Sequence, residues 1–295
     1  MAKNTYTESN VKRKRVSVST VLIYLVLCFW SFTTIYPIIW VVQNSFKAKD
    51  KILGNSFALP VGELFTLANY KKAFSNLDIF GAYKNSIFIS AMVSVFVIIF
   101  AGLAAFALVR YSFKLRGVLY SLVIAGMMFP VYATIIPVFT MEVKWGITNT
   151  SSWGLTMLSV ILPQIAGNLS FAIVVLTGFI RGLPIELEEA AYMEGCNAFQ
   201  IFAKVIVPLT KPSFATVAIF SFLWSYNDLF TQMFFLRRPE MRAITRLLNE
   251  LTSQEGTNYG LMASAVTLVV VPILIVYIFL QKYIIKGMTA GAIKG

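Results

Sequence analysis

Six apolar stretches, each about as long as a helix that crosses a bilayer, constrain this chain more than any other feature. A membrane-spanning helix needs about 20 apolar residues, and its backbone polar groups must be satisfied without water. Only 13% of the residues are charged, whereas soluble domains carry about one quarter. The sequence therefore predicts an all-α integral membrane protein with spans at residues 20–43, 86–109, 118–140, 155–179, 213–236 and 262–284.

Flanking charges predict how these spans are oriented. The run "KRKR" at 12–15 and Lys3 precede the first span, and basic residues beside a span favour the cytoplasmic side. Residues 1–17 then form a cytoplasmic basic extension, and residues 18–295 form the transmembrane domain. Six spans return the C-terminus to the cytoplasm, so both termini are expected there. The segment 181–212 and the tail 286–295 are also expected to be cytoplasmic, and the loops 44–85 and 237–261 are expected outside.

Prolines mark the third and fourth spans. Pro130 and Pro137 lie in the third span and Pro163 lies in the fourth. A proline removes one helical hydrogen bond and bends the helix, and the freed carbonyl needs another partner in lipid. We therefore expect both helices to be kinked and packed inside a bundle.

The residue types present exclude several classes of function. The net charge is +12, but the basic residues flank the spans instead of forming a patch, so a bilayer and not nucleic acid is the expected partner. Histidine is absent, and the two cysteines, Cys28 and Cys196, form no metal or disulfide framework. The chain also has no GxxxxGK[ST] loop that could cradle ATP phosphates. We therefore expect no catalysis, no metal and no cofactor in this chain.

The segment between the fourth and fifth spans combines charge with helix signals. Three glutamates, Glu186, Glu188 and Glu189, lie where the positive end of a helix dipole favours them. Gly195 suits a left-handed helix end, and Asn197 suits the start of a second helix. The second helix is predicted to end at a proline and to present an apolar face made of Phe199, Phe202 and Ile206. Two interpretations remain open at this point: a hairpin lying on the membrane surface, or one docked in a groove of another protein.

The stretch "EAAYMEGCNAFQIFAKVIVPLTKP" at 189–212 resembles the EAA loop in the membrane subunits of binding-protein-dependent ABC importers. Glu194 stands where the family more often has Asp, and Cys196 stands where it usually has Ala. "LAAFALVR" at 103–110 and "WSYNDLFTQMFFL" at 224–236 are similar to segments of sugar permeases. The ending "GMTAGAIKG" resembles the maltose-type second subunit of the carbohydrate uptake group. The resemblance covers residues 20–295.

This resemblance implies the type I ABC importer permease fold, with six transmembrane helices and a cytoplasmic coupling hairpin. The implied function is that of a transmembrane permease subunit in an ATP-driven importer of sugars, di- or oligosaccharides. Such a subunit forms half of the translocation pathway and couples closure of the ATPase dimer to alternating access. The implied partners are a second permease subunit, an ATPase dimer that binds the ATP, and an extracytoplasmic solute-binding protein, all at a bacterial cell membrane.

The resemblance also assigns roles to particular residues. In the coupling loop, Phe199 and Phe202 are expected to anchor the hairpin to the membrane domain, and Ala190 and Ala191 to allow close approach to the ATPase subunit. The full set implied for ATPase coupling is Glu189, Ala190, Ala191, Glu194, Gly195, Phe199, Phe202 and Pro208. Gly291, Lys294 and Gly295 are expected at the ATPase interface, and Arg242, Asn249 and Glu250 are expected to contact the binding protein.

Polar residues inside the spans are candidates for the substrate pathway. A charged residue within a span is costly and is by default functional or paired, and amide and carboxylate groups suit the hydroxyls of sugars. The candidates are Gln164, Asn168, Tyr226, Asn227 and Asp228. The same residue types also hold helices together through hydrogen bonds, so both roles remain open.

Two alternative functions remain open beside the sugar importer. A related ABC importer could carry another solute, such as glycerol phosphate or a modified or acidic sugar. A self-sufficient secondary transporter is the second alternative. The shortness of the chain, the lack of a visible internal repeat and the coupling hairpin all argue against a secondary transporter.

Overall fold

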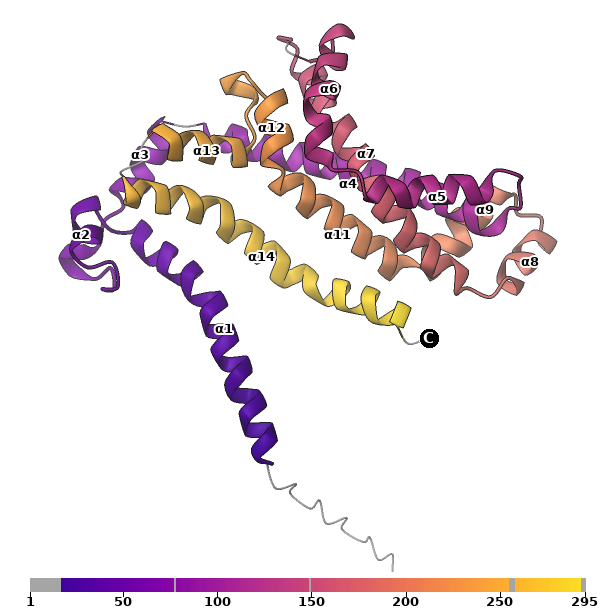
Figure 1. Cartoon of the computed structure of the whole chain (residues 1–295), viewed down its shortest axis with the longest axis horizontal. Coiled ribbons are helices and arrows are strands. Elements are labelled where there is room, and N and C mark those ends of the chain that lie inside the picture. Colours follow the sequence, from indigo (N-terminus) through magenta and orange to yellow (C-terminus); the bar gives the residue numbers. More distant parts are fainter. Residues whose placement is uncertain (1–16, 77, 149, 255–257, 293–295) are drawn as a thin grey trace, which may run out of the picture.

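The computed structural model describes residues 17–76, 78–148, 150–254 and 258–292, and the regular elements in these ranges are helices (Figure 1). Short helical turns, denoted η, join several of the longer helices. In chain order the elements are α1 (Val18–Ser45), α2 (Lys49–Gly54), η1 (Gly62–Leu64), α3 (Ala68–Asn76), α4 (Ile79–Arg110), α5 (Arg116–Met127), α6 (Val131–Lys144), α7 (Trp153–Arg181), α8 (Glu186–Met193), α9 (Ala198–Ile201), η2 (Phe202–Ile206), α10 (Val207–Leu209), α11 (Lys211–Asn227), α12 (Leu229–Phe235), η3 (Pro239–Met241), α13 (Ile244–Gln254) and α14 (Tyr259–Ala292).

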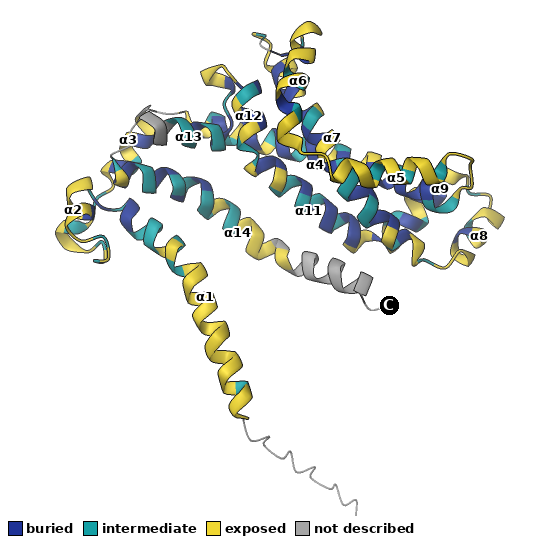
Figure 2. Ribbon diagram, viewed as in Figure 1, coloured by how far each residue is buried: buried dark blue, intermediate teal, exposed yellow. Residues whose placement is uncertain are grey.

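Four long helices form the centre of the molecule. Helix α4 packs against α7 and α11, and α11 packs against α14. Small side chains occupy much of the buried side of α4, including those of Ser86, Ser90, Ser94 and Ala101. Small residues let helix backbones approach closely, and the resulting van der Waals packing favours helix association in lipid. Buried residues accordingly follow the facing sides of these helices (Figure 2).

The buried apolar residues fall into two clusters. The larger cluster joins α4 and α7 to the segment from α9 to α11, and its fully buried members include Val97, Leu176 and Ile206. The smaller cluster lies at the opposite end of the bundle, where α3, α13 and the start of α14 meet. The hairpin between α7 and α11 is therefore built on the larger core, and α13 on the smaller one.

Helix α1 packs against α14 but diverges from it toward its own N-terminus (Figure 1). Its N-terminal part projects away from α14 (Figure 1), and none of the residues in its most apolar window is buried. Only Asn44 and Ser45, at its C-terminal end, are buried. A helix that exposes apolar residues on all sides is suited to lipid, so α1 has the character predicted for a first span.

Four of the six predicted spans lie within single long helices. Helices α1, α4 and α7 and the described part of α14 are each long and apolar enough to cross a membrane, and the number rises to six if each of two bent pairs counts as one span. The chain is therefore a multi-pass membrane protein. Helix α14 runs on to Ala292 and includes Gly291, so the predicted tail mostly continues the helix. Residues 1–16, Lys294 and Gly295 lie outside the described residues.

The third span differs from the prediction. Helices α5 and α6 meet at Pro130 with a bend of 101°, which is far more than a kink. No residue of α5 is buried, and in α6 only Ile135 and Glu142 are buried. The expectation that this span is packed inside the bundle is therefore wrong. For the fourth span the predicted packing is confirmed, because half of the most apolar window of α7, the helix that contains Pro163, is buried. The predicted kink at Pro163 stays a prediction.

The fifth span is also not one helix. Helix α11 ends at Asn227, and α12 begins at Leu229. The side chain of Asp228 accepts a hydrogen bond from the backbone N–H of Thr231 at 3.1 Å and so caps α12. An aspartate that caps a new helix competes with continuation of the old one, which explains a break that apolarity alone does not predict.

Candidate functional site

The hairpin between α7 and α11 turns at Gly195 as predicted. Gly195 has a φ of +84°, which is the left-handed region that favours glycine. The N–H of Gly195 donates to the carbonyl of Tyr192 at 2.9 Å, and the N–H of Cys196 donates to the carbonyl of Ala191 at 3.1 Å. These two bonds form a Schellman motif that closes the end of α8. The turn is therefore a defined structure and not a loose loop.

The second helix of the hairpin begins at the predicted cap. The side chain of Asn197 accepts from the N–H of Gln200, and the side chain of Gln200 accepts from the N–H of Asn197, both at 2.9 Å. Farther on, the N–H of Val207 donates to the carbonyl of Phe202, so η2 is a π-helical turn. This wider turn lets Pro208 sit inside the helical run. The helix ends at Leu209, one residue after the predicted end at Pro208, and a bend of 84° leads into α11.

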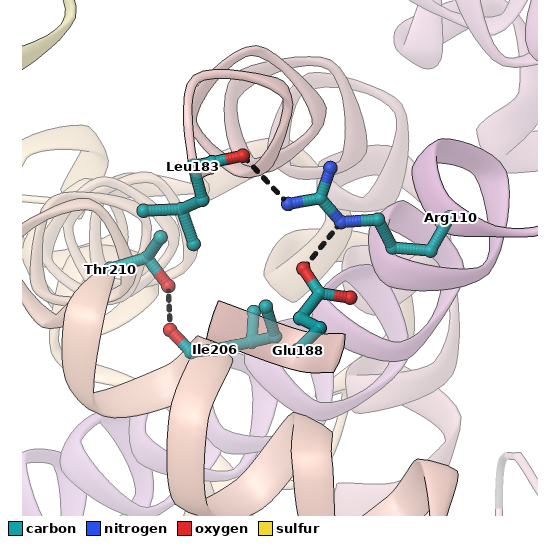
Figure 3. A network of polar contacts seen from close by, with 5 residues as sticks. All are labelled: Arg110, Leu183, Glu188, Ile206 and Thr210. Carbon is teal, nitrogen blue, oxygen red and sulfur yellow. Dashed lines mark hydrogen bonds and ion pairs between the residues drawn. The ribbon is translucent and has the colours of Figure 1, made fainter. Parts of the chain in front are cut away.

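A buried ion pair holds the hairpin to the membrane domain. Arg110 Nε lies 2.6 Å from Glu188 Oε1, and Arg110 Nη2 donates to the carbonyl of Leu183 at 3.0 Å (Figure 3). On the other side of the hairpin, Thr210 Oγ1 donates to the carbonyl of Ile206 at 2.6 Å. The sequence analysis did not predict the pairing of Glu188, because its partner lies 78 positions earlier in the chain.

Phe202 is the aromatic anchor of the hairpin, but Phe199 is not. The Phe202 ring lies 5.5 Å from the Phe106 ring and 6.4 Å from the Phe214 ring, measured between centroids. Gly102 makes room for it, because a Cβ there would lie 2.7 Å from Phe214 Cε1 and 3.1 Å from Phe202 Cζ. Phe199 is 67% exposed. Its predicted anchoring role is wrong, because it lies in the first turn of the helix, before that helix reaches the core.

The outer side of the hairpin presents acidic and apolar side chains together. Glu189, Ala190 and Glu194 are exposed, and Met193 is 85% exposed. Ala191 differs from its predicted role, because it is half-buried and packs toward the larger core. The sequence analysis did not single out Tyr192 and Met193, whose large apolar side chains are exposed at the end of α8. Their exposure at the end of the bundle marks a surface suited to a protein partner.

A pocket of about 740 Å³ opens beside α6, α7 and the junction of α11 with α12. Pro130 lines it at the bend between α5 and α6, so the unexpected bend creates one of its walls. The lining is aromatic and apolar apart from a few polar groups, as is typical of sites for small ligands. Its polar residues with amide or carboxylate groups are Gln164, Asn168, Asn227 and Asp228.

Hydrogen bonds connect these polar residues across the break in the fifth span. Gln164 Nε2 donates to Asp228 Oδ2 at 2.9 Å, and Ser225 Oγ donates to Gln164 Oε1 at 2.5 Å. Asn168 Nδ2 donates to the carbonyl of Gln164 at 2.7 Å. The structure thus brings together four of the five predicted pathway residues and adds Ser225. Whether they contact a substrate stays a prediction.

Tyr226, the fifth predicted pathway residue, does not line the pocket. It is 4% exposed and belongs to the smaller core, where its ring stacks with that of Phe222. Adjacent residues on an α-helix are rotated by about 100°, so Tyr226 points away when Trp224 and Ser225 face the pocket. The prediction for Tyr226 as a substrate contact is therefore wrong.

The predicted contact residues for a binding protein lie on or beside α13. Arg242 Nη1 and Glu250 Oε2 form an ion pair at 2.8 Å, and Asn249 is half-buried on the same helix. Ile244 and Leu247 bury the other side of α13 in the smaller core. The pair therefore joins α13 to the segment just before it, while Ile244 and Leu247 pack α13 against the end of the bundle opposite the hairpin. The contact role of these residues stays a prediction.

Known proteins resemble this chain over most of its length. Residues 94–290 match the family described as the binding-protein-dependent transport system inner membrane component. The arabinooligosaccharides transport system permease protein AraQ of Halalkalibacterium halodurans is 30% identical over 97% of this chain and all of the relative. The diacetylchitobiose uptake system permease protein NgcG of Streptomyces coelicolor is 29% identical over 92% of this chain and 88% of the relative. A chain in the crystal structure of a bacterial ABC transporter that imports the acidic polysaccharide alginate has the same fold, with a TM-score of 0.76, 24% identity and coverage of 95% and 99%.

Proposed function

We propose that this chain is a permease subunit of an ATP-driven sugar importer. The premise is that the chain belongs to the family of binding-protein-dependent transport system inner membrane components. The relatives named for arabinooligosaccharides and diacetylchitobiose match nearly the whole chain. They support a di- or oligosaccharide as the solute. The chain itself provides part of the membrane pathway and performs no catalysis.

One observation carries the coupling role: the hairpin is rigid within itself, bonded to the membrane domain and exposed on its outer side. The Schellman turn and the capping box define its shape. The Arg110–Glu188 pair and Phe202 bind it to α4 and the core. A partner that moves the exposed surface therefore displaces α4 and α11 instead of deforming a loop.

The partner at this surface is the ATPase subunit of the transporter. Glu189 and Glu194 provide charge, and the apolar side chains of Met193 and Phe199 provide contact area around them. ATP binds to that subunit, whose dimer closes and moves the hairpins. For the C-terminal residues Gly291, Lys294 and Gly295 we propose the same partner.

Two further surfaces, the side on which the pocket opens and the end of the bundle that carries α13, are assigned to the other partners. The pocket opens on the side of the bundle where α5 and α6 have few buried residues, so a second permease subunit covers it and completes the pathway. Arg242, Asn249 and Glu250 lie at the opposite end from the hairpin, where they face the extracytoplasmic solute-binding protein. Both termini are then cytoplasmic in a bacterial cell membrane, in keeping with the basic run at 12–15.

The substrate passes the polar groups of the pocket. Gln164, Asn168, Asn227 and Asp228 provide donors and acceptors for hydroxyl groups. Hydrogen bonds already fix the orientations of Gln164 and Asp228, so little side-chain ordering is left to oppose binding.

Purification through an N-terminal tag, followed by mass spectrometry and reconstitution, tests this function. We expect an ATPase dimer and a second permease to copurify, and ATP-driven uptake of oligosaccharides once the binding protein is added. If the chain purifies without partner subunits and uptake is driven by a proton or sodium gradient, the chain is a secondary transporter instead. Uptake of glycerol phosphate without uptake of oligosaccharides would favour the other alternative.

A further inference from the structure

The pocket contains a carboxylate and no basic side chain. Asp228 is the only carboxylate in its lining, and no lysine or arginine of the described chain lines it. The arginines that follow α12 are engaged elsewhere. Arg237 lies over the Phe139 ring, 4.4 Å from its centroid, and Arg242 pairs with Glu250. The fixed charge that this chain contributes to the pocket lining is therefore negative.

The hydrogen bonds of Asp228 leave it as an acceptor toward the pocket. Oδ2 accepts from Gln164 Nε2 at 2.9 Å, and Oδ1 accepts from the N–H of Thr231 at 3.1 Å. Each carboxylate oxygen can accept more than one bond, so hydroxyl donors of a ligand can still be accommodated. In contrast, a second carboxylate brought close to Asp228 meets a like charge, and the membrane domain screens it less than water does.

The rest of the lining suits uncharged sugar rings. Trp224 is 48% exposed, and its ring lies 5.0 Å from that of Phe171. These aromatic faces can contact the C–H faces of a sugar while its hydroxyls reach the polar groups.

We propose that this pocket is a saccharide subsite that accepts neutral sugar units and rejects uronate units, with Asp228 as the specificity-determining residue. The inference rests on the proposed function and adds the charge class of the substrate. Rejection through like charge is a common source of specificity.

Equilibrium binding to the complete permease–ATPase complex in nanodiscs tests the proposal. ATP, combined with a hydrolysis-deficient ATPase subunit, keeps the complex in a single conformational state. The binding protein is omitted so that its own selectivity for sugars does not contribute to the measured affinity. The probes are neutral oligosaccharides, each paired with its counterpart in which a primary alcohol is oxidised to a carboxylate. We expect the wild-type complex to bind the neutral form about tenfold more tightly or better.

Three substitutions locate the origin of this preference. Asp228→Asn keeps the shape of the side chain and its capping oxygen but removes the charge, and we expect the preference to fall to about threefold or less. Asn227→Asp adds a negative charge at the adjacent lining residue and should widen the preference. Asp78→Asn is the matched control, because Asp78 caps α4 outside the pocket by accepting from the N–H of Gly81 at 2.9 Å. The control should leave the preference unchanged.

The inference and the proposed function fail in different ways. A wild-type preference for the oxidised form, or an unchanged preference in Asp228→Asn, would overturn the inference and leave the importer function intact. Saccharide-stimulated ATP hydrolysis without any binding to the complex would also overturn the inference. If no saccharide binds and none stimulates hydrolysis with the binding protein present, the proposed function itself is wrong. Thermal unfolding of each variant complex verifies that the substitution has not unfolded the chain.

Discussion

Arg110, the last residue of α4, and Glu188, in the first turn of α8, form an ion pair with Nε and Oε1 only 2.6 Å apart. Their side chains are 12% and 11% exposed, so solvent screens the pair little. Helix α4 belongs to the centre of the membrane domain, whereas α8 belongs to the hairpin. The pair is therefore a direct connection between the hairpin, whose outer surface we assign to the ATPase, and a helix at the centre of the membrane domain.

Arg110→Ala should weaken this connection and lower the stability of the complex. Removing one partner of a buried ion pair leaves the other charge uncompensated, which costs about 3–5 kcal/mol. We expect a lower unfolding temperature and ATP hydrolysis that no longer drives full uptake. Lys114→Ala, an exposed residue between α4 and α5, serves as the control. The double variant Arg110→Ala/Glu188→Ala should lose less than the sum of the single changes, and strict additivity would refute the pairing.

Gly195→Ala should destabilise the hairpin turn. A side chain at a φ of +84° costs about 1–2 kcal/mol per residue. Gly178→Ala is the matched control, because Gly178 lies within α7 and a Cβ there would meet no atom within 4 Å. Hydrogen exchange of α8 and α9 measures the effect. Equal exchange in the two variants would show that the left-handed turn is not required.

Gly102→Ala should displace Phe202 from its place against α4. The added Cβ would lie 2.7 Å from Phe214 Cε1, so a ring must shift, and overpacking of this kind costs about 1–3 kcal/mol. Gly117→Ala, where a Cβ would meet nothing within 4 Å, provides the comparison. We expect a lower unfolding temperature and reduced uptake for the first variant only. Similar values for both variants would mean that the contact between Gly102 and Phe202 is not tight.

Asn197→Ala should loosen the start of the second hairpin helix. It removes the side-chain oxygen that accepts from the N–H of Gln200 at 2.9 Å, and loss of such a cap costs about 1 kcal/mol. Asn197→Asp keeps an acceptor and should restore most of the protection from hydrogen exchange. If the Asp variant exchanges as fast as the Ala variant, the cap is not what orders this turn.

Glu189→Lys should uncouple the transporter while the chain remains folded. Glu189 is exposed on the surface that we assign to the ATPase subunit, so reversing its charge disturbs the contact and not the core. Glu63→Lys, at the exposed turn η1 far from the hairpin, is the matched charge reversal. Uptake by proteoliposomes and copurification of the ATPase measure the effect. Wild-type uptake by the Glu189 variant would remove this residue from the coupling surface.

The sequence predicted best those features that depend on a few adjacent residues. Gly195 and Asn197 act within one turn of helix, and both have the predicted roles. Long apolar segments likewise predicted α1, α4, α7 and α14, because lipid burial depends on segment length and composition. Predictions about the direction of a side chain were less successful, as with Phe199 and Tyr226.

Only the tertiary structure decided which residues meet across the chain. The pairing of Arg110 with Glu188, the 101° bend at Pro130 and the pocket beside Asp228 depend on how separate helices pack. A proline or an aspartate in an apolar run shows where a helix can break, but the neighbouring helices determine whether and how far it bends. The sequence by itself therefore determined four of the membrane-spanning helices and the local shape of the hairpin. Packing determined the breaks in the third and fifth spans, the pocket, and the ion pair that joins the hairpin to α4, because these require contacts between distant segments that local propensity does not encode.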